Sequence, residues 1–482
     1  MAKRKTHDRS GLSDIERDTL DFVNSITDEE AEAEEAARIR AKIKNRRMKQ
    51  RREARRRKQR LRRIYLTILA IVALLLILGI AGIVHAIGKA ISNRKAKNQA
   101  AADTEAVYEV NDAEIGVNTE TDTEAAEIVV EEPVHADDGT IDLVFVGDIL
   151  LHDPVEKYAL QEDGSYDFSS LFANTLEDIE EADLAIVNQE VVIGGEELGV
   201  SGYPTFNAPY EMADCLAQTG FDVVLAANNH SWDKYSTGVK NELAYFDSHY
   251  PNMEVLGIHD SEADADEIYV YEQNGIRIAI LNYTYGSNAV VDADYSYMLD
   301  TLTESEVRAD IQAANELADL VIVCPHWGTE YSLEVDSTQK NWCQIFLEEG
   351  VDLVVGGHAH VIEPVQIYTN ETTGDQMIVY YSLGNFVNWT SSSGSGIANR
   401  NIGGMAKVSI GYDTSGNPKI LNYGVTALVC HDVSETNGIT VYKLADYTEE
   451  LAEANEIKSQ DSAFTLEYAI DLCDQIWGSL WE

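Results

Sequence analysis

The stretch VVLAANNHSWD, from Val223 to Asp233, begins as an apolar run and ends in two asparagines, a histidine and an aspartate. An apolar run without alternation is typical of a strand that is buried on both faces. The polar side chains therefore follow a buried strand at its carboxyl end. In open α/β sheets this is where the loops that carry binding and catalytic groups converge.

The same pattern occurs five times, each time with an aspartate that opens a short β-branched run and a polar residue that ends it. The runs are DLVFVGD (142–148), DLAIVNQE (183–190), DVVLAANNH (222–230), DLVIVCPHWG (319–328) and DLVVGGHAH (352–360). Helical patterns precede four of them, namely SSLFANTLEDIEE, APYEMADCLAQTG, ESEVRADIQAANELA and STQKNWCQIFLEEG. Strands that alternate with helices predict an α/β domain.

All five runs end in groups that can bind a metal or transfer a proton. One aspartate at a strand end is usually a cap and one histidine is usually structural, but capping does not explain five such ends. The residues expected to gather are Asp148, Glu190, Asn229, His230, His326, His358 and His360. Carboxylate, carboxamide and imidazole together suit Mn, Fe or Zn better than Ca or Mg, and this many ligands have room for two ions.

Six motifs in order resemble the CapA family of capsule synthesis proteins, which act with poly-γ-glutamate and are divergent relatives of calcineurin-like metallophosphoesterases. The motifs are GD (147–148), NQE (188–190), ANNHSWD (227–233), HWGTEY (326–331), GGHAH (356–360) and YSLGNF (381–386). The resemblance covers about residues 140–409 and implies a four-layer α/β/β/α sandwich. It also implies a role in making or exporting a poly-γ-glutamate-type capsule polymer.

The phosphoesterase comparison implies a role for each site residue. Asn229 would bind a metal through its carboxamide oxygen, and His230 would be the general acid, oriented by Asp233. The remaining metal ligands would be Asp148, Glu190, His326, His358 and His360. The chain departs from that pattern at two positions. A phosphoesterase has histidine where this chain has Leu150, and His152, two residues later, is the substitute. Glu190 stands in place of a bridging aspartate.

Three further side chains are weaker predictions for substrate binding: His152, Glu330 and Asn385. A helix-start cap explains Glu330 nearly as well, and a tight turn explains the Ser-x-Gly-Asn of YSLGNF. The mechanism expected from the whole set is metal-assisted hydrolysis or transfer at an amide or phosphoester. The alternative is a non-catalytic, metal-dependent scaffold that holds the polymer beside a membrane synthase.

Charge divides the chain into two parts. Of the 36 Lys and Arg, 25 lie before residue 98, whereas only 12 of the 83 Asp and Glu do. The acidic remainder repels polyanions, so we expect no nucleic-acid partner. Five widely spaced cysteines without a C-x-x-C pair indicate buried free thiols rather than a disulfide framework.

An uncharged apolar run over residues 64–87 is long enough to cross a bilayer and predicts a single transmembrane helix. Sixteen Lys or Arg lie between Arg38 and Arg63, against four just after the run, so residues 1–63 are expected in the cytoplasm. Residues 88–139 read as an acidic flexible stalk, and residues 140–482 as an extracytoplasmic domain. A cleaved signal peptide is the competing interpretation, but the run is too long for one.

Overall fold

The computed structural model describes residues 139–433 and 438–481. The cytoplasmic tail and transmembrane helix expected over residues 1–87 lie outside the described residues, as does the stalk up to residue 138. Among the residues described, no helix is both long enough and apolar enough to span a bilayer. The fold described here is therefore that of the predicted outer domain.

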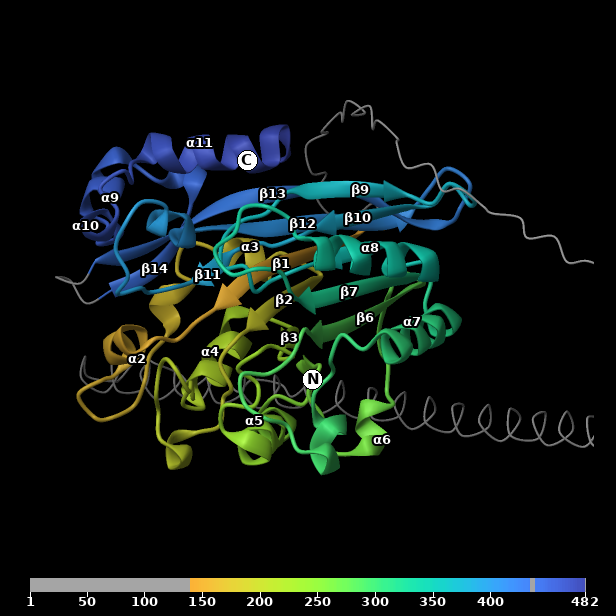
Figure 1. Ribbon diagram of the computed structural model, residues 1–482, viewed down its shortest axis with the longest axis horizontal. Coiled ribbons are helices and arrows are strands. Elements are labelled where there is room, and N and C mark those ends of the chain that lie inside the picture. Colours follow the sequence, from red (N-terminus) through yellow and green to blue (C-terminus); the bar gives the residue numbers. More distant parts are fainter. Residues whose placement is uncertain (1–138, 434–437, 482) are drawn as a thin grey trace, which may run out of the picture. The chain divides into compact units, whose positions relative to one another are not determined.

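Within the described residues the strands form two sheets (Figure 1). The eight-stranded sheet contains β1 (Ile141–Ile149), β2 (Leu184–Gln189), β3 (Val223–Leu225), β4 (Glu254–Leu256), β11 (Asn385–Val387), β12 (Ile402–Tyr412), β13 (Pro418–Val433) and β14 (Gly438–Lys443). Its order is β14-β13-β12-β1-β2-β3-β4, with β11 paired to β1. The six-stranded sheet contains β5 (Tyr269–Gln273), β6 (Ile276–Thr284), β7 (Leu320–His326), β8 (Leu353–Val355), β9 (Val365–Thr369) and β10 (Gln376–Tyr380). Its order is β5-β6-β7-β8-β10-β9.

The five apolar runs of the sequence are strands; β1 pairs in parallel with β2, β2 with β3, and β7 with β8. β1, β2 and β3 lie in the eight-stranded sheet, whereas β7 and β8 lie in the six-stranded sheet. The polar ends therefore come from two sheets. An α/β fold is confirmed for this part of the chain.

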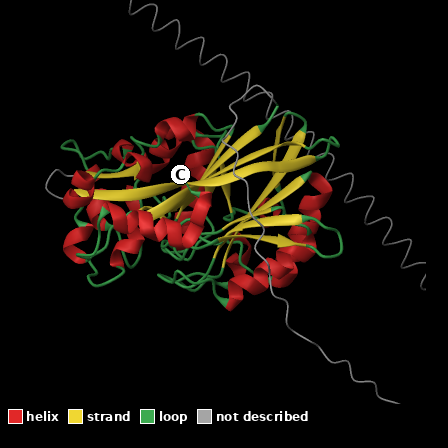
Figure 2. Ribbon diagram, turned by 90° about the horizontal axis from the view of Figure 1, so that it is seen from above, coloured by secondary structure: helices red, strands yellow, loops and turns green. Residues whose placement is uncertain are grey.

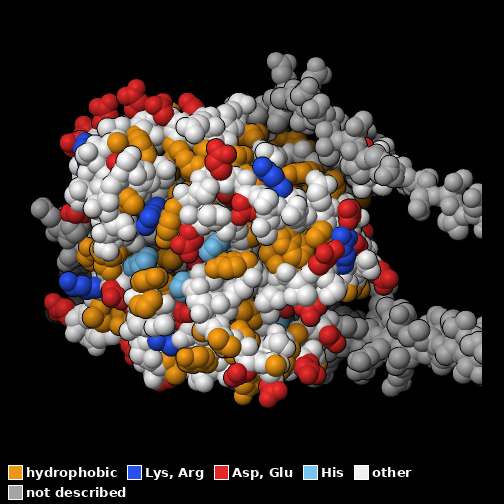
Figure 3. All heavy atoms as spheres, viewed as in Figure 1, with side chains coloured by type: hydrophobic (Ala, Val, Ile, Leu, Met, Phe, Trp, Pro, Cys, Tyr) orange, Lys and Arg blue, Asp and Glu red, His pale blue; other side chains and the backbone are white. Residues whose placement is uncertain are grey.

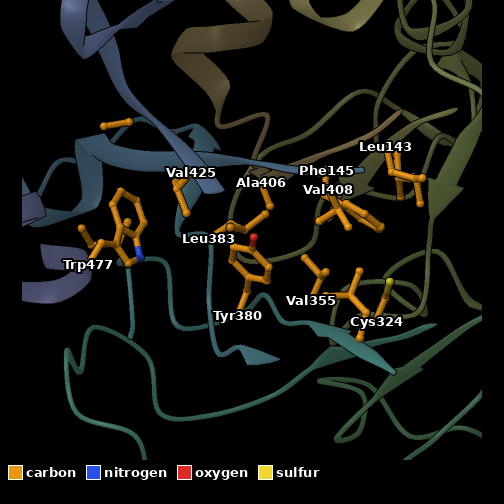
Figure 4. Close-up of a cluster of buried hydrophobic side chains, with 14 of the residues drawn as sticks. Leu143, Phe145, Cys324, Val355, Tyr380, Leu383, Ala406, Val408, Val425 and Trp477 are labelled. Carbon is orange, nitrogen blue, oxygen red and sulfur yellow. The ribbon is translucent and has the colours of Figure 1, made fainter. Parts of the chain in front are cut away.

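The two sheets face each other across one apolar core (Figure 4). Leu143 and Phe145 of β1 point into this core together with Cys324 of β7 and Val355 of β8. The intervening residue of β1, Val144, points to the opposite face and packs in a second cluster. This alternation is the side-chain period of a strand, and it makes both faces of β1 apolar.

Helices cover the outer faces of both sheets (Figure 2). On the eight-stranded sheet they are α2 (Asp153–Ala159), α3 (Leu176–Glu180), α4 (Glu211–Thr219) and α5 (Tyr235–His249). On the six-stranded sheet they are α7 (Glu304–Leu317) and α8 (Ser337–Glu349). The layers are thus helices, sheet, sheet and helices. The remaining helices are α6 (Glu262–Ala265), α9 (Glu449–Ala454), α10 (Ile457–Gln460) and α11 (Leu466–Trp477).

Local sequence explains where α8 begins and ends. The side chain of Asp336 accepts hydrogen bonds from the backbone N–H groups of Thr338 and Gln339, and the side chain of Gln339 accepts one from the backbone N–H of Asp336, which is a capping box. Gly350 ends the helix with φ +81°, a conformation that glycine adopts without strain. Because α8 leads directly into β8, the end of α8 at Gly350 determines where β8 starts. It therefore also determines where His358 and His360, which follow β8, are placed.

The C-terminal α11 packs at the edge of the core between the sheets. Trp477 is buried there and donates a hydrogen bond from Nε1 to the backbone oxygen of Glu363 at 3.1 Å. All five cysteines are buried and free, as the sequence predicted. Packing of apolar side chains, without disulfides, therefore holds the domain together.

Candidate metal centre

The ends of β1, β2 and β7 bring three predicted ligands together, although the strands belong to different sheets. Asp148 lies near the end of β1, Glu190 directly follows β2, and His326 is the last residue of β7. The Oε1 atom of Glu190 lies 3.4 Å from Nε2 of His326. All three residues are almost completely buried. The convergence expected from the sequence therefore occurs where the two sheets meet.

The loop after β8 supplies the other two histidines. His358 has φ +89° and His360 has φ +56°, so both adopt the left-handed conformation that non-glycine residues rarely take. The backbone N–H of His358 donates to Oδ2 of Asp148, and Nδ1 of His360 lies 3.1 Å from the same oxygen. The irregular turn needed to aim both histidines at one centre is present.

The two glycines of this loop, Gly356 and Gly357, do not supply its left-handed backbone conformation, because the histidines themselves adopt it. A Cβ on Gly357 would lie 2.5 Å from Oδ1 of Asp148, and one on Gly356 would lie 2.1 Å from a backbone oxygen of Tyr381. The two glycines are required because the chain approaches its neighbours closely.

Several buried polar atoms at this centre have no hydrogen-bond partner among the described residues. Among them are Nδ1 of His358 and both carboxylate oxygens of Glu190, although Oε1 of Glu190 lies within ion-pair distance of His326 and His360. An unpaired polar atom in a buried position is costly, and a bound cation would satisfy these atoms. Two groups have ligand atoms within 4.8 Å of one another, one made of Glu190, His358 and His360 and the other of Asp148, Glu190 and His326. The residues fit a divalent metal, and Glu190 belongs to both groups.

Electrostatics favours the same conclusion. Burial raises the pKa of Glu190 to about 8 and lowers the pKa values of His326 to about 3 and His358 to about 2. Burial also acts to lower the pKa of His360, but the neighbouring carboxylates of Glu190 and Asp148 outweigh it and raise the pKa to about 9. The imidazoles of His326 and His358 are therefore neutral and have a lone pair for a metal, whereas a cation would displace the protons that Glu190 and His360 hold without it.

The motif ANNHSWD provides a further candidate ligand and a histidine–aspartate pair. Oδ1 of Asn229 lies 2.9 Å from Nε2 of His326, so two expected ligand atoms face each other. The next residue, His230, makes a 2.7 Å contact from Nδ1 to Oδ2 of Asp233. That oxygen also accepts a hydrogen bond from the backbone of Phe206 at 2.7 Å. Asp233 thus fixes the orientation of the His230 ring, and His230 is in neither of the two ligand groups.

The three weaker predictions occupy different environments. The ring of His152 packs edge-on against Phe206 at 5.3 Å, and burial lowers its pKa to about 4. Glu330 is exposed, and its charge contributes to the raised pKa values of Glu190 and His360. Asn385 is buried, and its amide spans Nδ1 of His360 at 3.1 Å and two backbone oxygens. This favours a supporting role for Asn385 over contact with a substrate.

Sequence reasoning missed three residues at this site. Asn188 donates from Nδ2 to Oδ1 of Asp148 at 2.6 Å, and Asn288 lies 3.3 Å from Nε2 of His230. Arg400 lies with its guanidinium over the ring of Tyr331. The NQE motif was the available signal for Asn188, whereas Arg400 belongs to no motif. A few histidine side chains reach the surface close together in Figure 3, with hydrophobic and charged side chains around them.

The family of the bacterial capsule synthesis protein PGA_cap matches residues 142–390. That range contains all six motifs quoted above. The PGA biosynthesis protein CapA of Bacillus subtilis (strain 168) is 29% identical over 287 residues, which are 54% of this chain and 67% of the relative. The capsule biosynthesis protein CapA of Bacillus anthracis is 30% identical over 201 residues, which are 40% of this chain and 46% of the relative.

Solved structures resemble the chain more weakly. The putative 5'-nucleotidase from Staphylococcus aureus in complex with alpha-ketoglutarate has 13% identity and a TM-score of 0.36, covering 59% of this chain and 54% of that one. The NAD nucleotidase NadN of Haemophilus influenzae has 11% identity and a TM-score of 0.38, covering 71% of this chain and 63% of that one. These values are too low to carry an argument about activity.

Proposed function

Because the chain belongs to the family of the bacterial capsule synthesis protein PGA_cap, we propose that it acts in the synthesis or export of a poly-γ-glutamate-type capsule polymer. The names of the two relatives support this role. The proposal includes an anchor at residues 64–87 and a domain outside the cytoplasm, both inferred from the apolar run and the basic residues before it. The partners would be the polymer and its membrane synthase.

We further propose that the domain performs metal-assisted hydrolysis or transfer at an amide or phosphoester. The ligands would be Asp148, Glu190, Asn229, His326, His358 and His360. A divalent transition metal, as one ion or two, supplies a Lewis acid and lowers the pKa of bound water. Glu190 would contribute to the site whether one ion or two are bound, since it belongs to both ligand groups.

The protein's own contribution to the chemistry centres on His230. Asp233 accepts the hydrogen bond from Nδ1, so the ring would act in its doubly protonated form, give the proton on Nε2 to the leaving group and keep the one on Nδ1. Phe206 packs edge-on against this ring at 4.7 Å and limits its rotation. The observation that carries the catalytic proposal is this oriented imidazole, which stands next to Asn229 and outside the ligand groups.

The test is His230→Ala in the full chain, in cells that make the polymer. We expect polymer output to fall by about 10²–10⁴-fold, the usual effect of removing a general acid, while metal content stays at the wild-type value. His249→Ala is the matched control, because His249 is exposed at the end of α5. Normal output from His230→Ala at wild-type protein levels would refute catalysis and favour the non-catalytic scaffold.

A second experiment tests the location. A reporter fused at residue 20 should resist external protease in intact cells, whereas one fused after residue 482 should be cleaved. The opposite pattern would refute the proposed orientation. Release of the outer domain from cells without residues 64–87 would favour a cleaved signal peptide.

A further inference from the structure

Arg400 differs from the other arginines of the described residues. Arg277 pairs with Asp319 at 2.7 Å, and Arg308 binds three glutamates. Arg400 makes no ion pair with any described carboxylate, and the hydrogen bond of its guanidinium is a 3.4 Å contact from Nη1 to Oγ1 of Thr390. The residue is half-buried. A partly buried charge without a counter-charge is costly, so this arginine is suited to an anion that comes from outside the chain.

The position of the guanidinium is well defined. Its Cζ lies 3.5 Å from the centroid of the Tyr331 ring, which is a cation–π contact. Tyr331 itself has φ +64°, and its backbone N–H donates to the backbone oxygen of Ala359 at 2.7 Å. The aromatic surface under Arg400 is therefore tied to the loop that carries His358 and His360. A guanidinium stacked in this way keeps its N–H groups available at its edge.

A second connection joins Arg400 to the metal centre. Nδ2 of Asn385 donates to the backbone oxygen of Arg400 at 2.9 Å and to that of His360 at 3.1 Å. The Tyr331 ring lies 5.8 Å from the His360 ring. Arg400 is thus held next to the ligand His360 through both its backbone and its side chain.

We propose that Arg400 binds a free α-carboxylate of the γ-glutamyl chain while a neighbouring bond of that chain lies at the metal centre. This inference rests on the proposed function, because it takes the polymer as the substrate. A γ-linked glutamate chain has one free carboxylate on each unit, and the fork of an arginine binds a carboxylate with two parallel hydrogen bonds. Because the domain is strongly acidic, the positive charge of Arg400 would attract an anionic polymer to the surface beside the metal centre.

The experiment measures binding of a short γ-linked glutamate oligomer to the purified, metal-loaded full chain by calorimetry. A second oligomer has the same backbone with its α-carboxylates converted to carboxamides. Arg400→Gln should weaken binding of the acidic oligomer by about 10- to 100-fold, the effect expected for a hydrogen bond to a charged group. Binding of the carboxamide oligomer and the metal content should be unchanged, and Arg400→Lys should recover part of the affinity.

Lys419→Gln is the control for loss of one positive charge. Lys419 is exposed, and in the sheet its backbone pairs with that of Gly411 in β12. The neighbouring residue of β12, Ile410, pairs with Ile141 at the start of β1. Lys419 therefore lies at the end of the strand opposite to Asp148, and its variant should bind both oligomers as the wild type does.

Three results would overturn the inference about Arg400. They are an unchanged affinity of Arg400→Gln for the acidic oligomer, an equal loss for both oligomers, and a loss of bound metal, which would make Arg400 structural. Each of these leaves the proposed function standing. Failure of the wild-type chain to bind the acidic oligomer would instead refute the proposed substrate and this inference with it.

Discussion

Replacement of Gly357 by alanine tests whether the close approach of the loop after β8 to β1 positions the metal ligands. A Cβ at this position would lie 2.5 Å from Oδ1 of Asp148 and 3.0 Å from Nδ2 of Asn188. The backbone of Gly357 is outside the left-handed region, so the contact, and not the backbone conformation, is what alanine would disturb. The carboxylate of Asp148 would have to move.

The distance from this Cβ to Oδ1 of Asp148 would be about 1 Å shorter than the ordinary contact of 3.4 Å, and both residues are buried. Such overpacking costs about 1–3 kcal/mol of stability. Metal–ligand distances in proteins lie within about 0.2 Å of their usual values, so displacement of the Asp148 carboxylate should also weaken metal binding. We expect the affinity for the metal to fall by about 10- to 100-fold, which is the usual effect of removing a group that holds a metal ligand in place.

The assay is a competition titration of Mn, Fe or Zn between the purified full chain and a chromophoric chelator, with thermal unfolding of the metal-free chain measured alongside. Gly286→Ala is the control, because a Cβ there meets no atom within 4 Å and its backbone is equally unstrained. Wild-type metal affinity in Gly357→Ala would refute the reasoning, since it would mean that Asp148 can move without effect on the site.

Three further outcomes are expected. His358→Ala combined with His360→Ala should remove most of the bound transition metal, measured by elemental analysis, without loss of the folded circular dichroism spectrum; equal metal content would make these histidines structural. Asp233→Asn should lower polymer output less than His230→Ala does, since Asp233 only orients the ring; a larger loss would contradict that role. Burial lowers the pKa of His259, but hydrogen bonds to two aspartates outweigh it and raise the pKa to about 9. Because this folded-state pKa is above the unfolded value near 6.5, the stabilisation is complete below about pH 6.5 and is lost as pH rises through 9. Between pH 6 and pH 9.5, the free energy of unfolding in urea should fall by at most about 3 kcal/mol more in the wild type than in His259→Gln. An equal fall in the two chains would refute this role of His259.

The sequence predicted the strands well because burial on both faces leaves a plain signature. Each of the five apolar runs is a strand, and the family resemblance seen in the six motifs is confirmed by the match over residues 142–390. The run SSLFANTLEDIEE was less well predicted, since it forms a 3-10 helix (Ser169–Leu171) and the short α3 instead of one helix. The hydroxyl of Thr175 bonds to the backbone oxygen of Phe172 at 3.2 Å, which competes with helical hydrogen bonding there.

The site was predicted in outline but not in its supporting contacts. Strand-end residues carry a local signal, because the polarity changes abruptly after an apolar run. Arg400 carries no such signal, since its significance comes from its contact with Tyr331 and from the lack of a counter-charge among the described residues, and both depend on the folded chain. Periodicity also cannot tell to which of two sheets a buried strand belongs, so the division of the ligands between the sheets became visible only in the structure.

That division has a consequence for how the domain unfolds. Asp148 and Glu190 lie at the ends of strands of one sheet and the three histidines lie at the ends of strands of the other, with Asp148 and His358 in contact across 210 residues of sequence. A metal ion at a free concentration 100 times its dissociation constant would add about 2.7 kcal/mol to the free energy of unfolding, and this stabilisation would be lost if the sheets separated. The ion would link the two sheets in addition to the apolar core that they share, in a chain whose cysteines are all free. Hydrogen exchange should therefore show that chelation lowers the free energy of opening for amides in both sheets.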